Sequence, residues 1–248
     1  MNIGVVFAGG VGSRMHSREV PKQFLEIHNK PIIIHTLEYF ERCEDIDAVV
    51  ISCVGEWIPY LEKLLYKFRI EKVKRVVQGG ATGQLSIYNG LKAAREVAAG
   101  QIRNAIVLIH DGVRPLISEE LLSANIESVK KYGSAITSGV VKETIVVIGE
   151  DGIVEEVPPR DRARVAKAPQ SFRLDDILSV HERALSEGRD NSTDSCTLMQ
   201  SYGYQLHMVD GPNENIKITT PDDFYTMRAI LDARENEQIY GLRNPDKE

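Results

Sequence analysis

A glycine-rich segment with two nearby basic residues lies close to the start of the chain. The apolar run 3–8 is typical of a buried strand. Three glycines follow this run at once: Gly9, Gly10 and Gly12. A glycine-rich turn directly after a strand lets backbone N–H groups come close to a bound anion. Arg14 and Lys22 add two cations beside the turn, and a polyphosphate is the anion that such a site suits best.

This segment does not match the common nucleotide-binding motifs. The sequence has no G-x-x-x-x-G-K-S/T loop, and the fingerprint G-x-G-x-x-G fails because position 15 is Met. A tight connection between a strand and a helix would explain the glycines alone. The additional Arg14, and Lys22 within Pro21-Lys22-Gln23, favour an anion site over that simpler interpretation.

A second glycine-rich loop, Gln78 to Ser86, follows another predicted strand. Gly79 and Gly80 again offer backbone donors at the end of a strand. Ser86 is either a phosphate ligand or the N-cap of the next helix, and the residue types favour neither.

The loop His110-Asp111-Gly112-Val113-Arg114 follows the most apolar predicted strand. Open α/β sheets bind ligands at the carboxyl ends of their parallel strands, so this loop is a candidate for the site. Asp111 and Arg114 either serve a polyol and a phosphate separately or pair with each other in a structural turn. For His110 we favour an inward-facing histidine over a general base.

Basic residues occur in two later segments. Arg160, Arg162 and Arg164 alternate with other residues, and a solvated strand face would also explain that pattern. Lys217 precedes Thr220-Pro221, which is typical of a helix start, and an ordinary surface lysine is the alternative there.

Together these segments resemble the cytidylyltransferases that activate sugar-alcohol phosphates with CTP, namely the methylerythritol-phosphate and ribitol-5-phosphate cytidylyltransferases. The resemblance begins with Ala8-Gly9-Gly10-x-Gly12-x-Arg14-Met15 and Pro21-Lys22-Gln23-Phe24-Leu25, and continues through Lys30-Pro31-Ile32-Ile33. Four further motifs extend it to about residue 225.

The resemblance implies a role for each candidate residue. The catalytic residues implied are Arg14, Lys22 and Lys217. The nucleotide-binding residues implied are Ala8, Gly9, Gly10, Gly12, Gly79, Gly80, Ser86 and Asp111. The residues implied for the acceptor phosphate are Arg114, Thr144 and Arg160. Mg²⁺ is the implied cofactor, held mainly by the phosphates, with Asp111 as a candidate ligand.

The chain departs from the family pattern at two positions. Gly83 stands where many members carry an arginine, so that cation's role cannot be transferred to this chain. Ala168 replaces the threonine of a T-P-Q segment, while Thr193-Asp194 matches a family T-D segment in which Asp194 would shape the site.

Composition narrows the class of protein. The chain has 248 residues, of which 27% are charged, and a net charge of −6 argues against a general nucleic-acid binder. The three cysteines are not spaced like metal ligands, and their odd number does not suit a disulfide framework. A reducing cytoplasm is therefore the simplest setting for this protein. No apolar run approaches the ~20 residues of a membrane span, and the N-terminus does not resemble a signal peptide.

Strand-like and helix-like segments alternate along the first half of the chain. The predicted strands are 3–8, 48–52, 74–77, 105–110 and 135–141. The predicted helices are 32–42, 57–68, 86–98 and one that begins at Ser118. This alternation predicts an α/β fold with a mostly parallel sheet covered on both faces. The resemblance implies a Rossmann-like, GT-A-like nucleotidyltransferase in one domain, residues 1–235, followed by a polar tail, 236–248.

A β-hairpin interrupts this alternation. The runs 144–148 and 153–157 flank a glycine-containing turn, as expected for two antiparallel strands. The segment 142–164 would be either a flap over the site or an arm that reaches a partner chain. The resemblance implies the second, a homodimer in which the arm of one subunit binds the acceptor phosphate at the other.

The expected reaction transfers CMP from CTP to a polyol phosphate and releases pyrophosphate. D-Ribitol 5-phosphate is the preferred acceptor because Glu56-Trp57-Ile58, Gly83 and Asp194-Ser195-Cys196 look more like the ribitol-using branch. 2-C-Methyl-D-erythritol 4-phosphate is the alternative acceptor. A different nucleotidyltransferase, or a non-catalytic nucleotide-binding regulator, is a more distant interpretation, and the presence of Arg14 and Lys22 disfavours the regulator.

Overall fold

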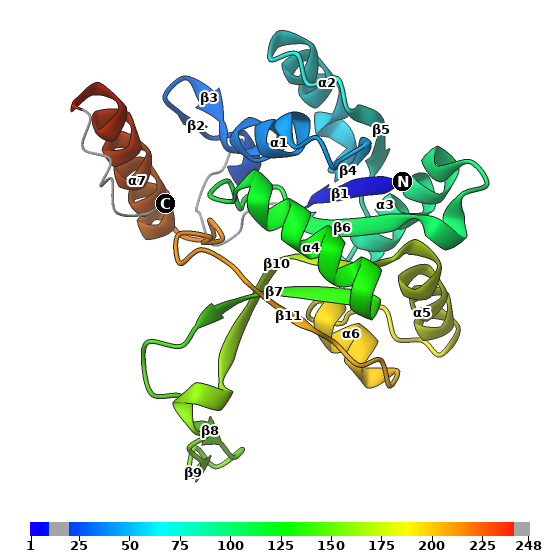
Figure 1. Cartoon of the computed structure of the whole chain (residues 1–248), viewed down its shortest axis with the longest axis vertical. Coiled ribbons are helices and arrows are strands. Elements are labelled where there is room, and N and C mark those ends of the chain that lie inside the picture. The colour runs from blue at the N-terminus through cyan, green and yellow to red at the C-terminus, as the bar shows by residue number, and fades with distance from the viewer. Residues whose placement is uncertain (10–19, 241–248) are drawn as a thin grey trace.

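Seven strands form one central sheet in the computed structural model, which describes residues 1–9 and 20–240 (Figure 1). Their order across the sheet is β11-β7-β10-β6-β1-β4-β5. The strands are β1 (Asn2–Ala8), β4 (Ala48–Cys53), β5 (Val73–Gln78), β6 (Ile106–Asp111), β7 (Ser134–Val140), β10 (Arg164–Arg173) and β11 (Met208–Asp210). Neighbouring strands are parallel except at β10, which runs antiparallel to β6 and β7. The mostly parallel α/β sheet expected from the sequence is therefore confirmed.

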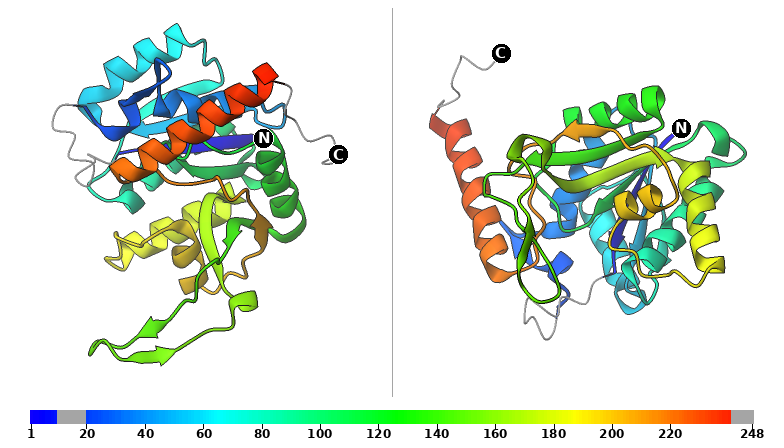
Figure 2. Two further views of the ribbon diagram at one scale, coloured as in Figure 1. Left: turned by 90° about the vertical axis from the view of Figure 1, so that its left-hand side faces the viewer. Right: turned by 90° about the horizontal axis from the view of Figure 1, so that it is seen from below.

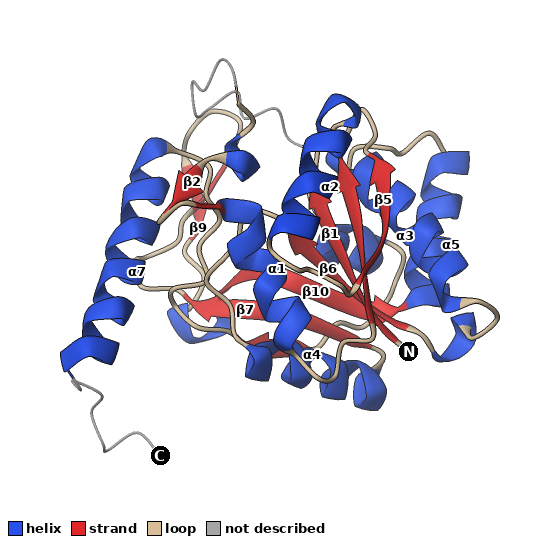
Figure 3. Cartoon of the chain, turned by 90° about the horizontal axis from the view of Figure 1, so that it is seen from above, coloured by secondary structure: helices blue, strands red, loops and turns tan. Residues whose placement is uncertain are grey.

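Helices cover both faces of this sheet (Figure 3). The helices are α1 (Ile32–Arg42), α2 (Ile58–Lys67), α3 (Gly83–Ala98), α4 (Glu119–Tyr132), α5 (Leu174–Ser186), α6 (Ser195–Ser201) and α7 (Pro221–Tyr240). On β1, Val6 packs with α1, α2 and α4, whereas Val5 packs on the other face with α3, α5 and α6. Alternate residues of a strand point to opposite faces, so an uninterrupted apolar run can fill two cores at once.

Local sequence explains where two of these helices begin. The Thr82 hydroxyl accepts a hydrogen bond from the Leu85 N–H at 3.1 Å, so α3 starts at Gly83 rather than at the expected residue 86. Ser118 caps α4 in the same way, at 3.2 Å from the Leu121 N–H, as the sequence predicted. Both caps place a loop at the carboxyl end of the preceding strand.

The predicted hairpin projects from the body of the molecule (Figures 1 and 2). Its strands, β8 (Val147–Ile148) and β9 (Val154–Glu156), pair antiparallel and are shorter than expected. Its apolar side chains are exposed, including Ile148 at 60% and Ile153 at 65%. Arg160–Arg162 forms a short 3₁₀ helix, so of the three alternating arginines only Arg164 belongs to a strand, and the interpretation as a strand face was wrong for the other two.

The last helix, α7, lies along one side of the molecule (Figure 2). Met227 of α7 is fully buried with Ile27 and Ile32, beside the two-stranded sheet of β2 (Glu26–Ile27) and β3 (Lys30–Pro31). The helix continues to Tyr240, so the first five residues of the expected polar tail are helical. Among the described helices, none combines the length and apolar character needed to cross a bilayer.

Candidate active site

Asp111 and two cations form the charged centre of the candidate site. Asp111 is the last residue of β6, and its Oδ2 accepts a hydrogen bond from Arg114 Nε at 2.8 Å. Its Oδ1 lies 2.6 Å from Lys217 Nζ, which comes from the segment before α7. Burial would raise the pKa of Asp111, but Lys217 and Arg114 outweigh it and lower the pKa to about 2. Asp111 is therefore ionised at neutral pH.

The loop after β6 is held by hydrogen bonds to backbone groups. Arg114 Nη1 donates to the Asn215 carbonyl at 3.1 Å, which joins this loop to the segment that carries Lys217. His110 Nε2 donates to the Arg114 carbonyl at 3.0 Å, and the His110 side chain is fully buried. Burial lowers the pKa of His110 to about 4, so the ring is neutral at pH 7. The inward-facing histidine expected from the sequence is thus what the structure shows.

Of the two arrangements left open for Asp111 and Arg114, the structure shows the ion pair. Arg114 is only 13% exposed and points its guanidinium at Asp111 and at the backbone of Asn215. Lys217 is 40% exposed, so it is the more accessible of the two cations. The ammonium of Lys217 pairs with a buried carboxylate even though the side chain lies at the surface. The roles of these side chains toward a substrate stay predictions.

Ser86 lies in the first turn of α3 and closes the second glycine-rich loop. Its Oγ accepts a hydrogen bond from the Gly80 N–H at 3.0 Å and donates to the Thr82 carbonyl at 3.0 Å. Because Thr82 occupies the N-cap, the alternative in which Ser86 caps the helix is wrong. Ser86 is 3% exposed, and it fixes the backbone of the loop.

The glycines around Ser86 are required by close approach. A Cβ at Gly9 would lie 2.9 Å from Ser86 Oγ, and one at Gly79 would lie 3.1 Å from the same atom. A Cβ at Gly80 would lie 2.3 Å from the Leu85 Cβ, which no side chain could accommodate. The ends of β1 and β5 and the start of α3 therefore meet at Ser86 because these positions lack side chains.

The Pro-Lys-Gln segment is anchored to the end of β1. Gln23 Nε2 donates to the Ala8 carbonyl at 2.7 Å, and Gln23 is 1% exposed. Lys22 begins the short 3₁₀ helix Lys22–Phe24 and is partly exposed. The predicted site residues Gly10, Gly12 and Arg14 lie outside the described residues. The structural role of Gln23 was missed, although its place in a motif was the signal for it.

A cavity of about 300 Å³ lies beside the charged centre. Asp111, Arg114 and Lys217 line it together with Gly83 and Gln84 from the start of α3. Apart from the adjoining backbone, no atom of residues 1–9 and 20–240 lies within 4 Å of the position that a Cβ at Gly83 would take. As far as the described residues go, the place where many family members carry an arginine is therefore open space on the wall of this cavity.

Several residues of the cavity wall were missed by sequence reasoning. Gln84 Oε1 accepts from the Ser192 N–H at 2.6 Å, so it holds the loop before α6 against α3. Gln170 Nε2 donates to Asp194 Oδ2 at 2.9 Å, and both side chains line the cavity, while the site-shaping role of Asp194 stays a prediction. Lys167 also lines the cavity, and nothing in its exposed-looking segment indicated this.

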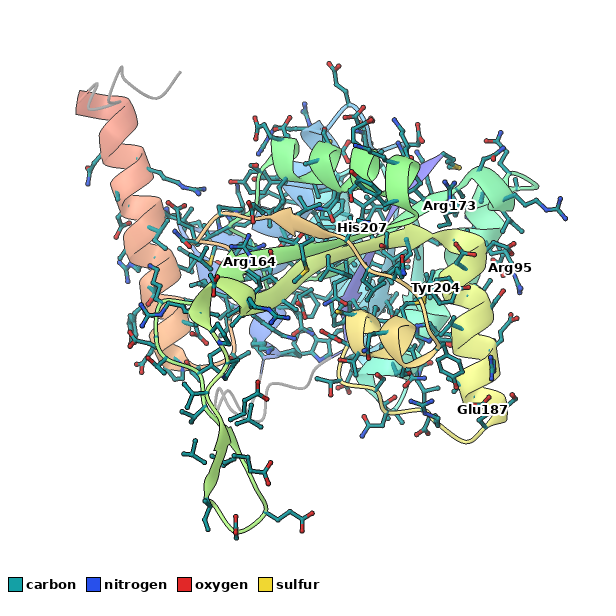
Figure 4. The ribbon with its side chains drawn as sticks, turned by 60° about the horizontal axis from the view of Figure 1, so that its bottom comes forward. Arg95, Arg164, Arg173, Glu187, Tyr204 and His207 are labelled. Atoms are coloured by element: carbon teal, nitrogen blue, oxygen red, sulfur yellow. The ribbon has the colours of Figure 1, made fainter. Side chains whose placement is uncertain are left out.

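Thr144 and Arg160, the residues implied for the acceptor phosphate, meet each other but not the cavity. Arg160 Nη2 donates to Thr144 Oγ1 at 3.4 Å, at the base of the projecting arm. Neither residue lines the cavity that Asp111 and Lys217 share. Figure 4 shows the arm extending away from the sheet beyond Arg164. Within one chain, then, the charged centre and the arm residues form two separate groups.

The side chains of the site can be compared with those that bind Mg²⁺ in nucleotide-binding proteins. Within residues 1–9 and 20–240, no three His, Cys, Asp or Glu side chains lie together as a metal cluster. Mg²⁺ in nucleotide sites is commonly bound by one or two carboxylates together with substrate phosphates. The ionised Asp111 supplies one such carboxylate on the cavity wall, and its oxygens have lone pairs beyond those used by its two cations. The residues present therefore fit a metal held mainly by phosphates.

A comparison with protein families identifies the chain. The family described as "IspD: 2-C-methyl-D-erythritol 4-phosphate cytidylyltransferase" matches residues 3–233. The chain belongs to the IspD family. Its members are nucleotidyltransferases, so this IspD-family chain is a cytidylyltransferase, an enzyme that acts on CTP and a polyol phosphate.

Individual relatives refine the comparison of this IspD-family chain. A ribitol-5-phosphate cytidylyltransferase of Streptococcus agalactiae serotype V is 57% identical, covering 98% of this chain and all of the relative. A 2-C-methyl-D-erythritol 4-phosphate cytidylyltransferase of Clostridium acetobutylicum is 37% identical and covers 93% of this chain and 97% of the relative. The solved structure of a 4-diphosphocytidyl-2C-methyl-D-erythritol synthase from Anaerococcus prevotii matches with a TM-score of 0.80 and 29% identity, covering 93% of this chain and 96% of that one. The likeness to the Streptococcus relative is thus markedly greater.

Proposed function

We propose that this cytidylyltransferase transfers CMP from CTP to D-ribitol 5-phosphate, forming CDP-ribitol and pyrophosphate. The observation that carries the proposal is the 57% identity, over 98% of this chain and all of the relative, to a protein named for ribitol 5-phosphate. The relative named for methylerythritol phosphate reaches 37%. Because the family itself is described by methylerythritol phosphate, that acceptor is the alternative that the experiment must test.

In the proposed reaction, an oxygen of the acceptor phosphate attacks the α-phosphorus of CTP in line. A P–O bond forms there, the bond from the α-phosphorus to the bridging oxygen breaks, and pyrophosphate leaves with that electron pair. A phosphate monoester is already an anion at neutral pH, so no side chain needs to remove a proton. The barrier lies in charge repulsion and positioning, which fixed cations reduce.

The cations of the site would perform that task. Lys217 would stabilise negative charge at the α-phosphorus, and Asp111 would hold its ammonium in place at 2.6 Å. Arg14 and Lys22 would hold the β- and γ-phosphates on the opposite side. Mg²⁺, where bound by the phosphates and Asp111, would supply further positive charge to the triphosphate.

We also propose a homodimer in which the arm, residues 142–164, completes the partner's site. Two observations support it: the arm exposes a row of apolar side chains, and Arg160 and Thr144 lie apart from the cavity of their own chain. An exposed apolar segment of this kind is typical of an interaction site. Arg160 and Thr144 would then bind the acceptor phosphate at the partner's charged centre.

Mixing two inactive variants tests the shared site. An Arg160→Ala chain and a Lys22→Ala chain should each be inactive, and their heterodimers should regain activity because one of the two sites contains both intact residues. A fully active monomer, or verified heterodimers without activity, would contradict the proposal.

We place the reaction in the cytoplasm. All three cysteines, Cys43, Cys53 and Cys196, are free thiols, and burial raises the pKa of Cys53 to about 11. Unpaired thiols are typical of proteins in a reducing compartment. Fractionation of cells that express the tagged protein would test this placement.

Pyrophosphate release tests the proposed reaction directly. The purified protein with Mg²⁺ is given CTP, UTP, ATP or GTP, with D-ribitol 5-phosphate present or omitted. We expect release with CTP only when the acceptor is present. Faster turnover with another nucleotide would overturn the assignment to CTP, and release without an acceptor would indicate hydrolysis instead of transfer.

A further inference from the structure

Two buried polar side chains on the cavity wall have no role in the mechanism described above. His181 of α5 is 1% exposed, and Ser195 at the start of α6 is 2% exposed, yet both line the cavity. Ile109 and Leu198 line it as well and are equally buried, whereas Lys217 is 40% exposed. The cavity wall thus combines the charged centre with a buried part that contains His181 and Ser195 and follows directly on Asp194.

The polar atoms in the buried part of the wall lack partners among the residues that the structure describes. Neither ring nitrogen of His181 has a hydrogen bond, and the same is true of Ser195 Oγ. The ring of His181 stacks on Tyr88 of α3, with centroids 5.9 Å apart and an angle of 11° between the planes. Buried polar groups without partners are rare and destabilising, so a water or a ligand hydroxyl that reaches these atoms from the cavity would be stabilised there.

The chemistry of the two side chains limits what that ligand can be. Burial lowers the pKa of His181 to about 4, so the ring is neutral and offers one N–H donor and one acceptor. A serine hydroxyl likewise donates and accepts. No charged group is needed to match them, and an alcohol, which donates and accepts at one oxygen, suits them both.

We propose that His181 and Ser195 bind the terminal hydroxyl of the polyol acceptor and so select for its chain length. This inference rests on the proposed function. The acceptor's phosphate would lie at the cations, and the uncharged polyol chain is the part of the acceptor that suits the hydroxyl and ring nitrogens of Ser195 and His181. Ile109 and Asp111 point to the same side of β6, two residues apart, and both line the cavity, so the cavity follows the strand away from the charged centre.

The proposal explains how one site could separate two similar acceptors. D-Ribitol 5-phosphate has one more hydroxylated carbon than methylerythritol 4-phosphate, which carries a methyl branch instead. A site built to hydrogen-bond a hydroxyl rejects an analogue that lacks it far more strongly than an apolar pocket rejects a missing methylene. His181 and Ser195 place such hydrogen-bonding groups where the longer chain would end.

Two variants and two acceptors test the proposal. His181→Phe keeps a ring against Tyr88 and removes both nitrogens, and Ser195→Ala removes one oxygen. We expect kcat/KM for D-ribitol 5-phosphate to fall on the order of 10-fold or more in His181→Phe and severalfold in Ser195→Ala, mostly through KM. With erythritol 4-phosphate, which lacks the terminal hydroxylated carbon, both variants should match the wild type within about 2-fold, and KM for CTP should not change.

His207→Phe is the matched control. His207 also stacks on a tyrosine, Tyr132 at 4.1 Å, and its buried Nδ1 has no partner among the described residues, but His207 is not among the residues that line the cavity. This variant should leave the ratio of the two acceptors unchanged.

Each outcome has a defined meaning. Equal losses with both acceptors, or no loss with either, would overturn the inference, the second because water alone would then satisfy His181 and Ser195. If His181→Phe does not fold, as judged by circular dichroism, Ser195→Ala decides the matter alone. Failure of the wild-type enzyme to use D-ribitol 5-phosphate would instead overturn the proposed function, and it is seen before any variant is made.

Discussion

Replacement of Lys217 by methionine should weaken both the fold and the reaction, and the effect on the fold should depend on pH. Lys217→Met keeps much of the aliphatic side chain and removes the ammonium that lies 2.6 Å from Asp111 Oδ1. Of the two cations that contact Asp111, the variant keeps Arg114 and loses Lys217, while Asp111 stays buried. The carboxylate should therefore titrate at higher pH in the variant than in the wild type.

The magnitude follows from the pKa of Asp111. Burial raises it, Lys217 and Arg114 lower it, and the net result is about 2 against an ordinary 3.8. A difference of this size corresponds to about 2 kcal/mol of stability at neutral pH. Lys217 supplies part of it and is 40% exposed, so solvent screening reduces its share. We expect Lys217→Met to lower the free energy of unfolding by ~1–2 kcal/mol at pH 7.

The pH dependence gives this prediction its sign. A carboxyl group whose pKa is lower in the folded state stabilises the fold at any pH above its unfolded-state pKa. This stabilisation is lost as the pH falls through the folded-state pKa. The difference in unfolding free energy between wild type and variant should thus be full at pH 7. It should shrink as the pH falls from about 4 through 2, because Asp111 of the wild type becomes protonated only as the pH passes its folded-state pKa of about 2.

Urea denaturation from pH 7 down to the lowest pH at which the protein folds measures this difference. Lys63→Met, at an exposed position of α2, is the control and should change the stability little at any pH. The same Lys217→Met preparation should show kcat lowered on the order of 10²-fold. A difference in unfolding free energy that is zero at pH 7, or that grows on acidification, would refute the reasoning about Asp111.

Further predictions concern other residues of the site. Lys22→Ala and Arg14→Ala should each lower kcat on the order of 10²-fold or more. An effect confined to KM would mean that these cations bind the substrate and the transition state equally well, which would contradict their catalytic role. Gly83→Arg should fold normally, because in the described part of the chain nothing beyond the adjoining backbone lies within 4 Å of the new Cβ. The added cation should lower KM for CTP, and a large drop in Tm would contradict the open space. His110→Leu should lower Tm, since it removes the hydrogen bond to the Arg114 carbonyl, while a loss of kcat as large as that of Lys22→Ala would assign His110 a chemical role.

Much of the fold could be predicted because the first half of the chain alternates regularly. The predicted strand 48–52 and the observed β4, Ala48–Cys53, differ by one residue, since an apolar run bounded by polar loops leaves little choice. Strand β10 was not predicted as such, because Ala168-Pro169-Gln170 interrupts its alternation and polar residues occupy its first half. Its antiparallel direction is set by tertiary contacts with β6 and β7 that no local pattern records.

The candidate site was predictable where its residues lie in motifs and obscure where the chain brings them from elsewhere. Asp111 and Lys217 were both identified, but only the structure shows that one pairs with the other. The sequence offers two hydroxyl residues, Thr82 and Ser86, near the start of α3, and only the structure shows that Thr82 is the N-cap. Lys167 and His181 reach the cavity through chain reversals, and a lysine in an exposed-looking run or a histidine on an amphipathic helix gives no local sign of that.

The most direct test of the central claim is a comparison of acceptors. With saturating CTP and Mg²⁺, kcat/KM is measured side by side for D-ribitol 5-phosphate and 2-C-methyl-D-erythritol 4-phosphate. The account predicts a preference of about tenfold or more for D-ribitol 5-phosphate, because pocket contacts to a hydroxyl and a methyl branch separate the two. A preference of that size for the methylerythritol substrate would contradict it.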